Sequence, residues 1–166
     1  ELRARLKYTA PQIQPGFTDD NLTRFCEKHV AVHGTYEFIK LVDIEAAVLQ
    51  YLQGLDIDPQ IHLGAGPCLD QVKWSEGVFT YKKSADKNTR VAVSEAFAAV
   101  AETGTLVMCS GSDLLPSHNF LPDDHIVIVD CDRIVRYQED VWPLLRTGDH
   151  FPQRAINLIT GPSKTG

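Results

Sequence analysis

Residues 125–130 read His-Ile-Val-Ile-Val-Asp, and this stretch decides the fold class of the chain. Four β-branched apolar residues follow one another here, without the polar alternation of a strand that has one face in water. Such a run is typical of a strand that is buried on both faces, as in a parallel sheet covered by helices. The stretch therefore predicts an α/β fold.

Further strand and helix patterns alternate on both sides of this stretch. Short apolar runs predict strands over residues 35–40, 60–64, 77–81, 90–94, 105–109 and 155–160. Helical spacing or composition predicts helices over residues 22–30, 44–53, 95–101 and 137–146, the third of them because it is rich in alanine. Strands that alternate with helices indicate a parallel or mixed sheet with both faces covered.

The chain length fits one domain. It has 166 residues, and domains typically contain about 100–200. Residues 1–17 contain prolines and a glycine and show little periodicity, so we expect an arm or linker there and a single α/β domain over residues 18–166. The chain begins with Glu1 rather than Met and ends just after a strand-to-helix turn, so we expect the domain to be incomplete at both termini.

Composition narrows the function classes. Sixteen Lys and Arg stand against 22 Asp and Glu, a net charge of −6 that argues against a nucleic-acid partner. No apolar stretch approaches the ~18–20 residues of a membrane-spanning helix. The four cysteines lie far apart and form no C-x-x-C pair, so we expect neither a metal site nor an iron–sulfur cluster in this chain. Because no secretory signal is present, we expect a cytoplasmic protein.

The segment Glu102-Thr-Gly-Thr105 is the first candidate site. It is expected to join a helix to a strand through Gly104, with a carboxylate and two hydroxyl groups beside the turn. Glu102 is the candidate catalytic residue, as a nucleophile or a general base, and Thr103 and Thr105 are candidate anion ligands. The alternative is that Glu102 is solvated, Gly104 serves the backbone angle, and the threonines satisfy backbone groups.

The segment Gly161-Pro-Ser-Lys-Thr165 is the second candidate. A turn after a strand presents backbone N–H groups, and Ser163, Lys164 and Thr165 add side-chain donors, a combination that suits a phosphate or carboxylate. It is not a Walker A loop, because the earlier glycine of that motif is absent. The alternative is that Pro162 and Ser163 only begin a helix.

Other polar residues have weaker claims. Ser94, directly after a predicted strand, is a plausible anion contact or simply an N-cap. His118 and His125 lie seven residues apart across a loop with a proline, a spacing that favours histidines beside a strand over metal ligands. His62 lies in a predicted strand and has a still weaker claim to be a ligand.

Three segments, taken in order, resemble a known family. They are Ala101-Glu-Thr-Gly-Thr-Leu-Val, Leu121-Pro-Asp-Asp-His-Ile and Ile159-Thr-Gly-Pro-Ser-Lys-Thr. Together they look like the LUD domain, the family of lactate utilization protein C (LutC) and its YkgG-type relatives. The resemblance is strong from about Arg90 to Gly166. Lys164 replaces the more common Arg, which keeps the charge but loses the bidentate fork.

The resemblance implies a three-layer α/β/α fold of the NagB/RpiA/CoA-transferase type, with a mostly parallel sheet. It implies a role in the bacterial oxidation of L-lactate to pyruvate, with LutA-like and LutB-like partner subunits that carry the iron–sulfur clusters. This chain resembles the cluster-free third component, which supplies no redox cofactor of its own. On this hypothesis it is an accessory subunit that binds a small anion or a partner near Glu102, Thr105 and Lys164.

Two other hypotheses belong to different classes. The first is a stand-alone enzyme, either CoA-transferase-like or acting on a sugar phosphate or nucleotide, with Glu102 as nucleophile or base; this is an analogy between folds only. The second is a non-catalytic interaction module, in which the Gly161–Thr165 turn merely caps a helix.

Overall fold

A computed structural model of the chain describes residues 14–111, 115–147 and 154–162. Its helices are α2 (Asn21–Ala31), α3 (Ile44–Gly54) and α4 (Val141–Thr147), with short 3₁₀ turns η1 (Leu41–Asp43), η2 (Leu69–Gln71), η3 (Pro116–Asn119), η4 (Cys131–Arg133) and η5 (Gln138–Asp140). Its strands are β1 (Gln60–Leu63), β2 (Phe79–Tyr81), β3 (Val91–Glu95), β4 (Ala98–Val100), β5 (Thr105–Cys109), β6 (Asp124–Ile128), β7 (Ile134–Val135) and β8 (Ile156–Ile159). None of the described helices is long and apolar enough to cross a membrane.

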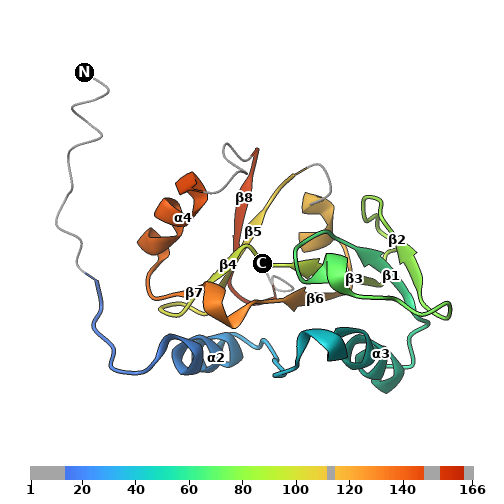
Figure 1. Cartoon of the computed structure of the whole chain (residues 1–166), viewed down its shortest axis with the longest axis horizontal. Helices are drawn as coiled ribbons and strands as arrows, with labels where there is room; N and C mark the ends of the chain where they lie inside the picture. The colour runs from blue at the N-terminus through green and yellow to red at the C-terminus, as the bar shows by residue number, and fades with distance from the viewer. Residues whose placement is uncertain (1–13, 112–114, 148–153, 163–166) are drawn as a thin grey trace.

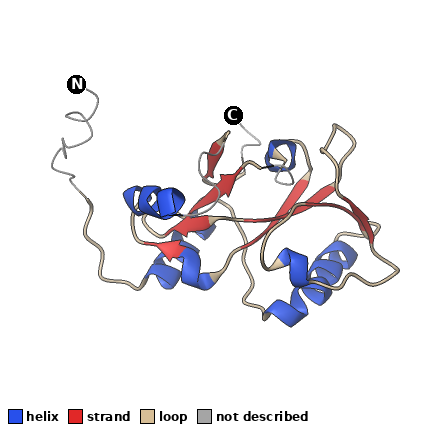
Figure 2. Cartoon of the chain, turned by 45° about the horizontal axis from the view of Figure 1, so that its top comes forward, coloured by secondary structure: helices blue, strands red, loops and turns tan. Residues whose placement is uncertain are grey.

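The strands form two four-stranded sheets (Figure 2). Sheet A has the order β2-β1-β3-β6 and all its pairs are parallel. Sheet B has the order β7-β4-β5-β8, with one parallel pair and two antiparallel pairs. The prediction of an α/β fold with a mostly parallel sheet is therefore confirmed, and sheet B adds a mixed part.

Helices cover one face of sheet A and both faces of sheet B (Figure 1). Helix α3 packs its buried side chains Ile44, Val48 and Leu52 against β1 and β3 of sheet A. Helix α2 packs against one face of sheet B and α4 against the other, because the side chains of β4 and β5 alternate between the two helices. The α2 side receives Ala99, Ala101, Leu106 and Met108, and the α4 side receives Ala98, Val100, Val107 and Cys109.

The alanine-rich segment 95–101 contains the last residue of β3 and the strand β4, and not the predicted helix. Residues 98–100 form β4 at the centre of sheet B, where both neighbours pair with it. Alanine has high helix propensity, but tertiary packing overrides it here, since helices press on both faces of β4 and every side chain from 98 to 101 is buried. Small side chains let these layers approach closely.

Two other expectations for strands need correction. Strand β6 is half-buried along its whole length, not fully buried, because it lies at the edge of sheet A and pairs only with β3. Residues 35–40, expected as a strand, pair with no strand in the described part of the chain. The helix predicted over residues 137–146 begins later than expected, as α4 at Val141, and Pro143 stands in its first turn, where proline is tolerated.

Candidate functional site

The turn that carries Glu102 connects two antiparallel strands, β4 and β5. It is therefore a hairpin turn, and the prediction that a helix ends here is wrong. Gly104 has a φ of 71°, and a Cβ at this position would lie 2.6 Å from the backbone nitrogen of His29 in α2. The Gly104 carbonyl oxygen lies 3.3 Å from Nδ1 of His29. Helix α2 thus packs directly on the turn, and only glycine fits there.

Three threonine hydroxyl groups form a chain next to this turn. Oγ1 of Thr105 lies 2.6 Å from Oγ1 of Thr103 and 2.6 Å from Oγ1 of Thr160. Thr105 is buried in the middle, while Thr103 is half-buried and Thr160 is exposed. Three hydroxyls carry three protons and the two mutual bonds use two of them, so one proton remains. When Thr105 donates to one neighbour, the proton of that neighbour is the free one, and it lies at an end of the chain.

The second predicted segment begins beside these threonines. Gly161 follows Thr160 directly, has a φ of 82°, and leaves no room for a Cβ, which would lie 2.6 Å from the carbonyl oxygen of Val32. Gly104 and Gly161 therefore both hold their turns against α2. The predicted ligands Ser163, Lys164 and Thr165 lie outside the described residues.

Glu102 and Ser94 form no hydrogen bond with the threonine chain among the described residues, and their surroundings differ. Glu102 is half-buried, and its backbone N–H donates to the carbonyl oxygen of Arg136 at 3.0 Å. Ser94 is buried in β3 of sheet A, behind Gly64. It lines a very small cavity with residues that include His118 and Asn119, and with no other predicted site residue among those described.

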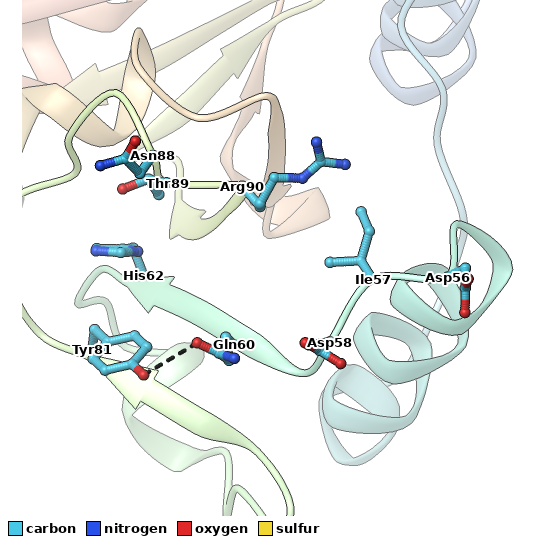
Figure 3. Close-up of a pocket in the computed structure, with 9 residues that line it drawn as sticks. All are labelled: Asp56, Ile57, Asp58, Gln60, His62, Tyr81, Asn88, Thr89 and Arg90. Atoms are coloured by element: carbon cyan, nitrogen blue, oxygen red, sulfur yellow. Dashed lines mark hydrogen bonds between the residues drawn. The ribbon is translucent and has the colours of Figure 1, made fainter.

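A larger cavity, of about 320 Å³, lies beside the amino ends of β1 and β3 and the carboxyl end of β2 (Figure 3). Its lining residues are polar apart from Ile57: Asp56, Ile57, Asp58, Gln60, His62, Tyr81, Asn88, Thr89 and Arg90. Tyr81 donates a hydrogen bond to Gln60 Oε1 at 3.3 Å, and Arg90 pairs with Asp123 at 3.0 Å. Because its lining includes two carboxylates but a single guanidinium that is already paired, this cavity suits an anion less well than the threonine chain does.

Three histidines share one face of sheet A. His62 and His125 flank Ala92 in register on β1, β3 and β6, and register partners point to the same face. His118 of η3 lies over this row, with its ring centroid 6.0 Å from that of His62 and its Nε2 2.9 Å from the carbonyl oxygen of Lys83. In the described part of the chain, no group of three or more His, Cys, Asp or Glu side chains could hold a metal ion.

Burial favours the neutral form of His62 and His125. It lowers the pKa of His125 to about 4, with a further contribution from His118, and lowers the pKa of His62 in the same way. One nitrogen on each of the three rings is buried without a hydrogen-bond partner among the described residues: His62 Nε2, His118 Nδ1 and His125 Nε2. His62 and His125 therefore oppose protonation.

The carboxyl end of β3 holds a carboxylate that the sequence analysis did not single out. Oε2 of Glu95 accepts hydrogen bonds from the backbone N–H groups of Cys68 and Leu69, at 2.8 and 3.0 Å. Burial and the neighbouring Glu95 raise the pKa of Cys68 to about 11, so this thiol stays protonated. The position of Glu95 directly after an apolar strand was the available signal, but the alanine-rich context favoured a helix. Arg90 was missed in the same way, at the other end of β3.

Comparisons with known proteins come from a family model and a solved structure. A family model described as the LUD domain matches residues 22–166. The fold is similar to the crystal structure of a DUF162 family protein from Deinococcus radiodurans, with a TM-score of 0.65 and 19% identity, over 86% of this chain and 88% of that one. Comparison with curated proteins gives no match.

Proposed function

Because this chain belongs to the LUD domain family, which is associated with lactate utilization, we propose that it is a LutC-like subunit of a bacterial L-lactate utilization system. In this role it works in the cytoplasm with LutA-like and LutB-like subunits, and those partners carry the iron–sulfur clusters that accept the electrons. The observation that carries the proposal is the family match over residues 22–166. The widely spaced cysteines agree with a cluster-free component.

We further propose that the subunit binds a small anion at the threonine chain. The hydroxyls of Thr103 and Thr160 end that chain, and when Thr105 donates to one of them, that end hydroxyl can donate its own proton to a carboxylate or phosphate. Ser163, Lys164 and Thr165 follow within five residues of Thr160 and add donors and a positive charge to the same segment. Glu102 lies in the same hairpin turn and is the candidate catalytic residue of this site.

The accessory role predicts the outcome of a reconstitution. The purified chain alone is expected to show no oxidation of L-lactate, because it supplies no redox cofactor, whereas its addition to the two iron–sulfur subunits is expected to increase their rate. L-lactate oxidation with an artificial electron acceptor measures both. Sustained turnover by the pure chain, or a rate of the two partners that does not respond to it, would show that the proposed role is wrong.

The anion site predicts the effect of two substitutions. Thr160→Val removes a hydroxyl at the exposed end of the threonine chain, and Lys164→Ala removes a positive charge. Each is expected to weaken binding of inorganic phosphate or L-lactate about tenfold, because hydrogen bonds to charged groups contribute about 1.5–3 kcal/mol. Isothermal titration calorimetry measures the affinity, with Thr80→Val on exposed β2 as the matched control. Equal affinities for all variants would show that the anion does not bind at the threonine chain.

A further inference from the structure

The very small cavity beside Ser94 lies where β1, β3 and β5 end, on the face of sheet A opposite α3. Val91 and Val93 of β3 pack with α3, so the alternation of the strand directs Ser94 to the other face. The room in the cavity is about 10 Å³, which is about the least that holds one water molecule. Its polar walls come from Ser94, Ser110, His118 and Asn119.

The ring of His118 is the most informative of these walls. It is 1% exposed, and its Nε2 lies 2.9 Å from the carbonyl oxygen of Lys83. A carbonyl oxygen only accepts hydrogen bonds, so Nε2 carries a proton and Nδ1 of the neutral ring presents a lone pair. Nδ1 is buried and has no hydrogen-bond partner among the described residues. A buried acceptor without a partner is unfavourable, so we expect a donor in the cavity beside it.

The other side chains around the cavity do not supply this donor. Ser94 is 4% exposed, and its hydroxyl forms no hydrogen bond with another described residue. Oγ of Ser110 accepts a hydrogen bond from the backbone N–H of Ala155 at 2.8 Å. A metal ion does not fit, because no group of three or more His, Cys, Asp or Glu in the described ranges could hold one. One hydroxyl and one ring nitrogen on the same small cavity therefore each have capacity for a further hydrogen bond.

We propose that this cavity is a binding site for one water molecule. The water donates a hydrogen bond to Nδ1 of His118 and accepts one from the hydroxyl of Ser94, so both buried groups are satisfied. It thereby joins η3 to β3. The same turn also holds the loop after β2, because Nε2 of His118 donates to Lys83 and Oγ of Ser117 accepts from the N–H of Ala85 at 2.9 Å. The water is thus part of the connection between that loop and sheet A.

Crystallography at high resolution tests the position of the water. The expected result is a peak of electron density about 2.7–3.2 Å from both Nδ1 of His118 and Oγ of Ser94. Nuclear magnetic resonance of the chain with isotope-labelled histidine tests the same assignment at neutral pH, where we expect a proton on Nε2 of His118 and none on Nδ1. A cavity without such a peak, or a His118 ring with a proton on Nδ1, overturns the proposal.

A substitution that fills the cavity tests whether the water is held there in solution. Ser94→Val removes the hydroxyl and adds methyl groups, so this variant is expected to lose one long-lived water molecule relative to the wild type. Oxygen-17 magnetic relaxation dispersion counts such molecules, because a buried water exchanges more slowly than a surface water. Ser117→Ala is the matched control. It breaks the bond to Ala85 in the same turn but leaves the walls of the cavity unchanged, so the count is expected to stay the same.

A second variant covers the case in which Ser94→Val does not fold, as judged by circular dichroism. Ser94→Ala removes one of the two partners without filling the cavity, so the water is expected to remain on His118 and to exchange faster than in the wild type. Equal counts of long-lived water in the wild type and Ser94→Val would show that no water is bound between the two residues. Equal exchange rates in the wild type and Ser94→Ala would show the same.

Discussion

Replacing Gly104 by alanine is expected to lower the free energy of unfolding by roughly 3 kcal/mol. Two effects add. The φ of 71° is unfavourable for any residue with a Cβ, and that Cβ would lie 2.6–2.7 Å from backbone atoms of His29 and Lys28, which cannot move without displacing α2. Urea denaturation followed by circular dichroism measures the change.

A matched glycine serves as the control for this prediction. Gly54 ends α3, and a Cβ there meets nothing within 4 Å. Gly54→Ala is therefore expected to leave the stability unchanged or to raise it by about 0.5–1 kcal/mol, because alanine reduces the entropy of the unfolded chain. If Gly104→Ala were as mild as Gly54→Ala, α2 could not be packed on the hairpin turn as described.

Acidification from pH 7 to pH 4 is expected to remove about 3 kcal/mol of stability through His125 alone, at about 1.36 kcal/mol per pKa unit. The ordinary pKa is 6.5, whereas the folded protein lowers it to about 4 because the ring nitrogen Nε2 is buried. Between pH 6.5 and pH 4, His125 therefore binds a proton in the unfolded chain but not in the folded chain. Stability is fully present above pH 6.5 and falls as the pH decreases toward 4, and His62 acts in the same direction.

A substitution tests whether His125 causes the loss of stability in acid. His125→Gln keeps the size of the side chain but no longer binds a proton in this range, so the loss of stability between pH 7 and pH 4.5 is expected to shrink. His33→Asn, at an exposed position, is the control and is expected to leave the loss unchanged. Urea denaturation at a series of pH values measures this loss of stability.

The pKa of Asp20 is lowered by hydrogen bonds from Thr23, so this residue affects stability only below the range of pH 7 to pH 4.5. Equal slopes for His125→Gln and the wild type would mean that another group controls the acid response.

Strands were predictable from the sequence wherever a short apolar run stood between turn residues. The predictions for β1, β2, β3, β5, β6 and β8 rest on such runs and are confirmed. The prediction failed at residues 98–100, where helix propensity favoured a helix but packing between α2 and α4 requires a strand. It also failed at residues 35–40, whose composition is that of a strand while no described strand lies beside them.

The candidate site was only partly accessible from the sequence. Thr103, Thr105 and Gly161 could be singled out as polar or flexible residues at turns. The contact of Thr105 with Thr160, however, depends on the antiparallel register of β5 with β8, which joins residues about 50 positions apart. Short motifs carry no information on such a register. The proximity of the histidines could not be predicted for the same reason, since only the pairing of β1, β3 and β6 brings His62 and His125 to one face.

The order in which these parts are made differs from the order in which they pack. Helix α2 leaves the ribosome first, yet its buried residues Phe25 and Cys26 pack against strands that include Ile134, about a hundred residues later. At roughly 5–20 residues per second, α2 waits about 5–20 s for that surface. Helix α3 and sheet A need only the chain up to Ile128. During synthesis α3 and sheet A are therefore expected to fold first. The apolar face of α2 stays uncovered until sheet B is complete.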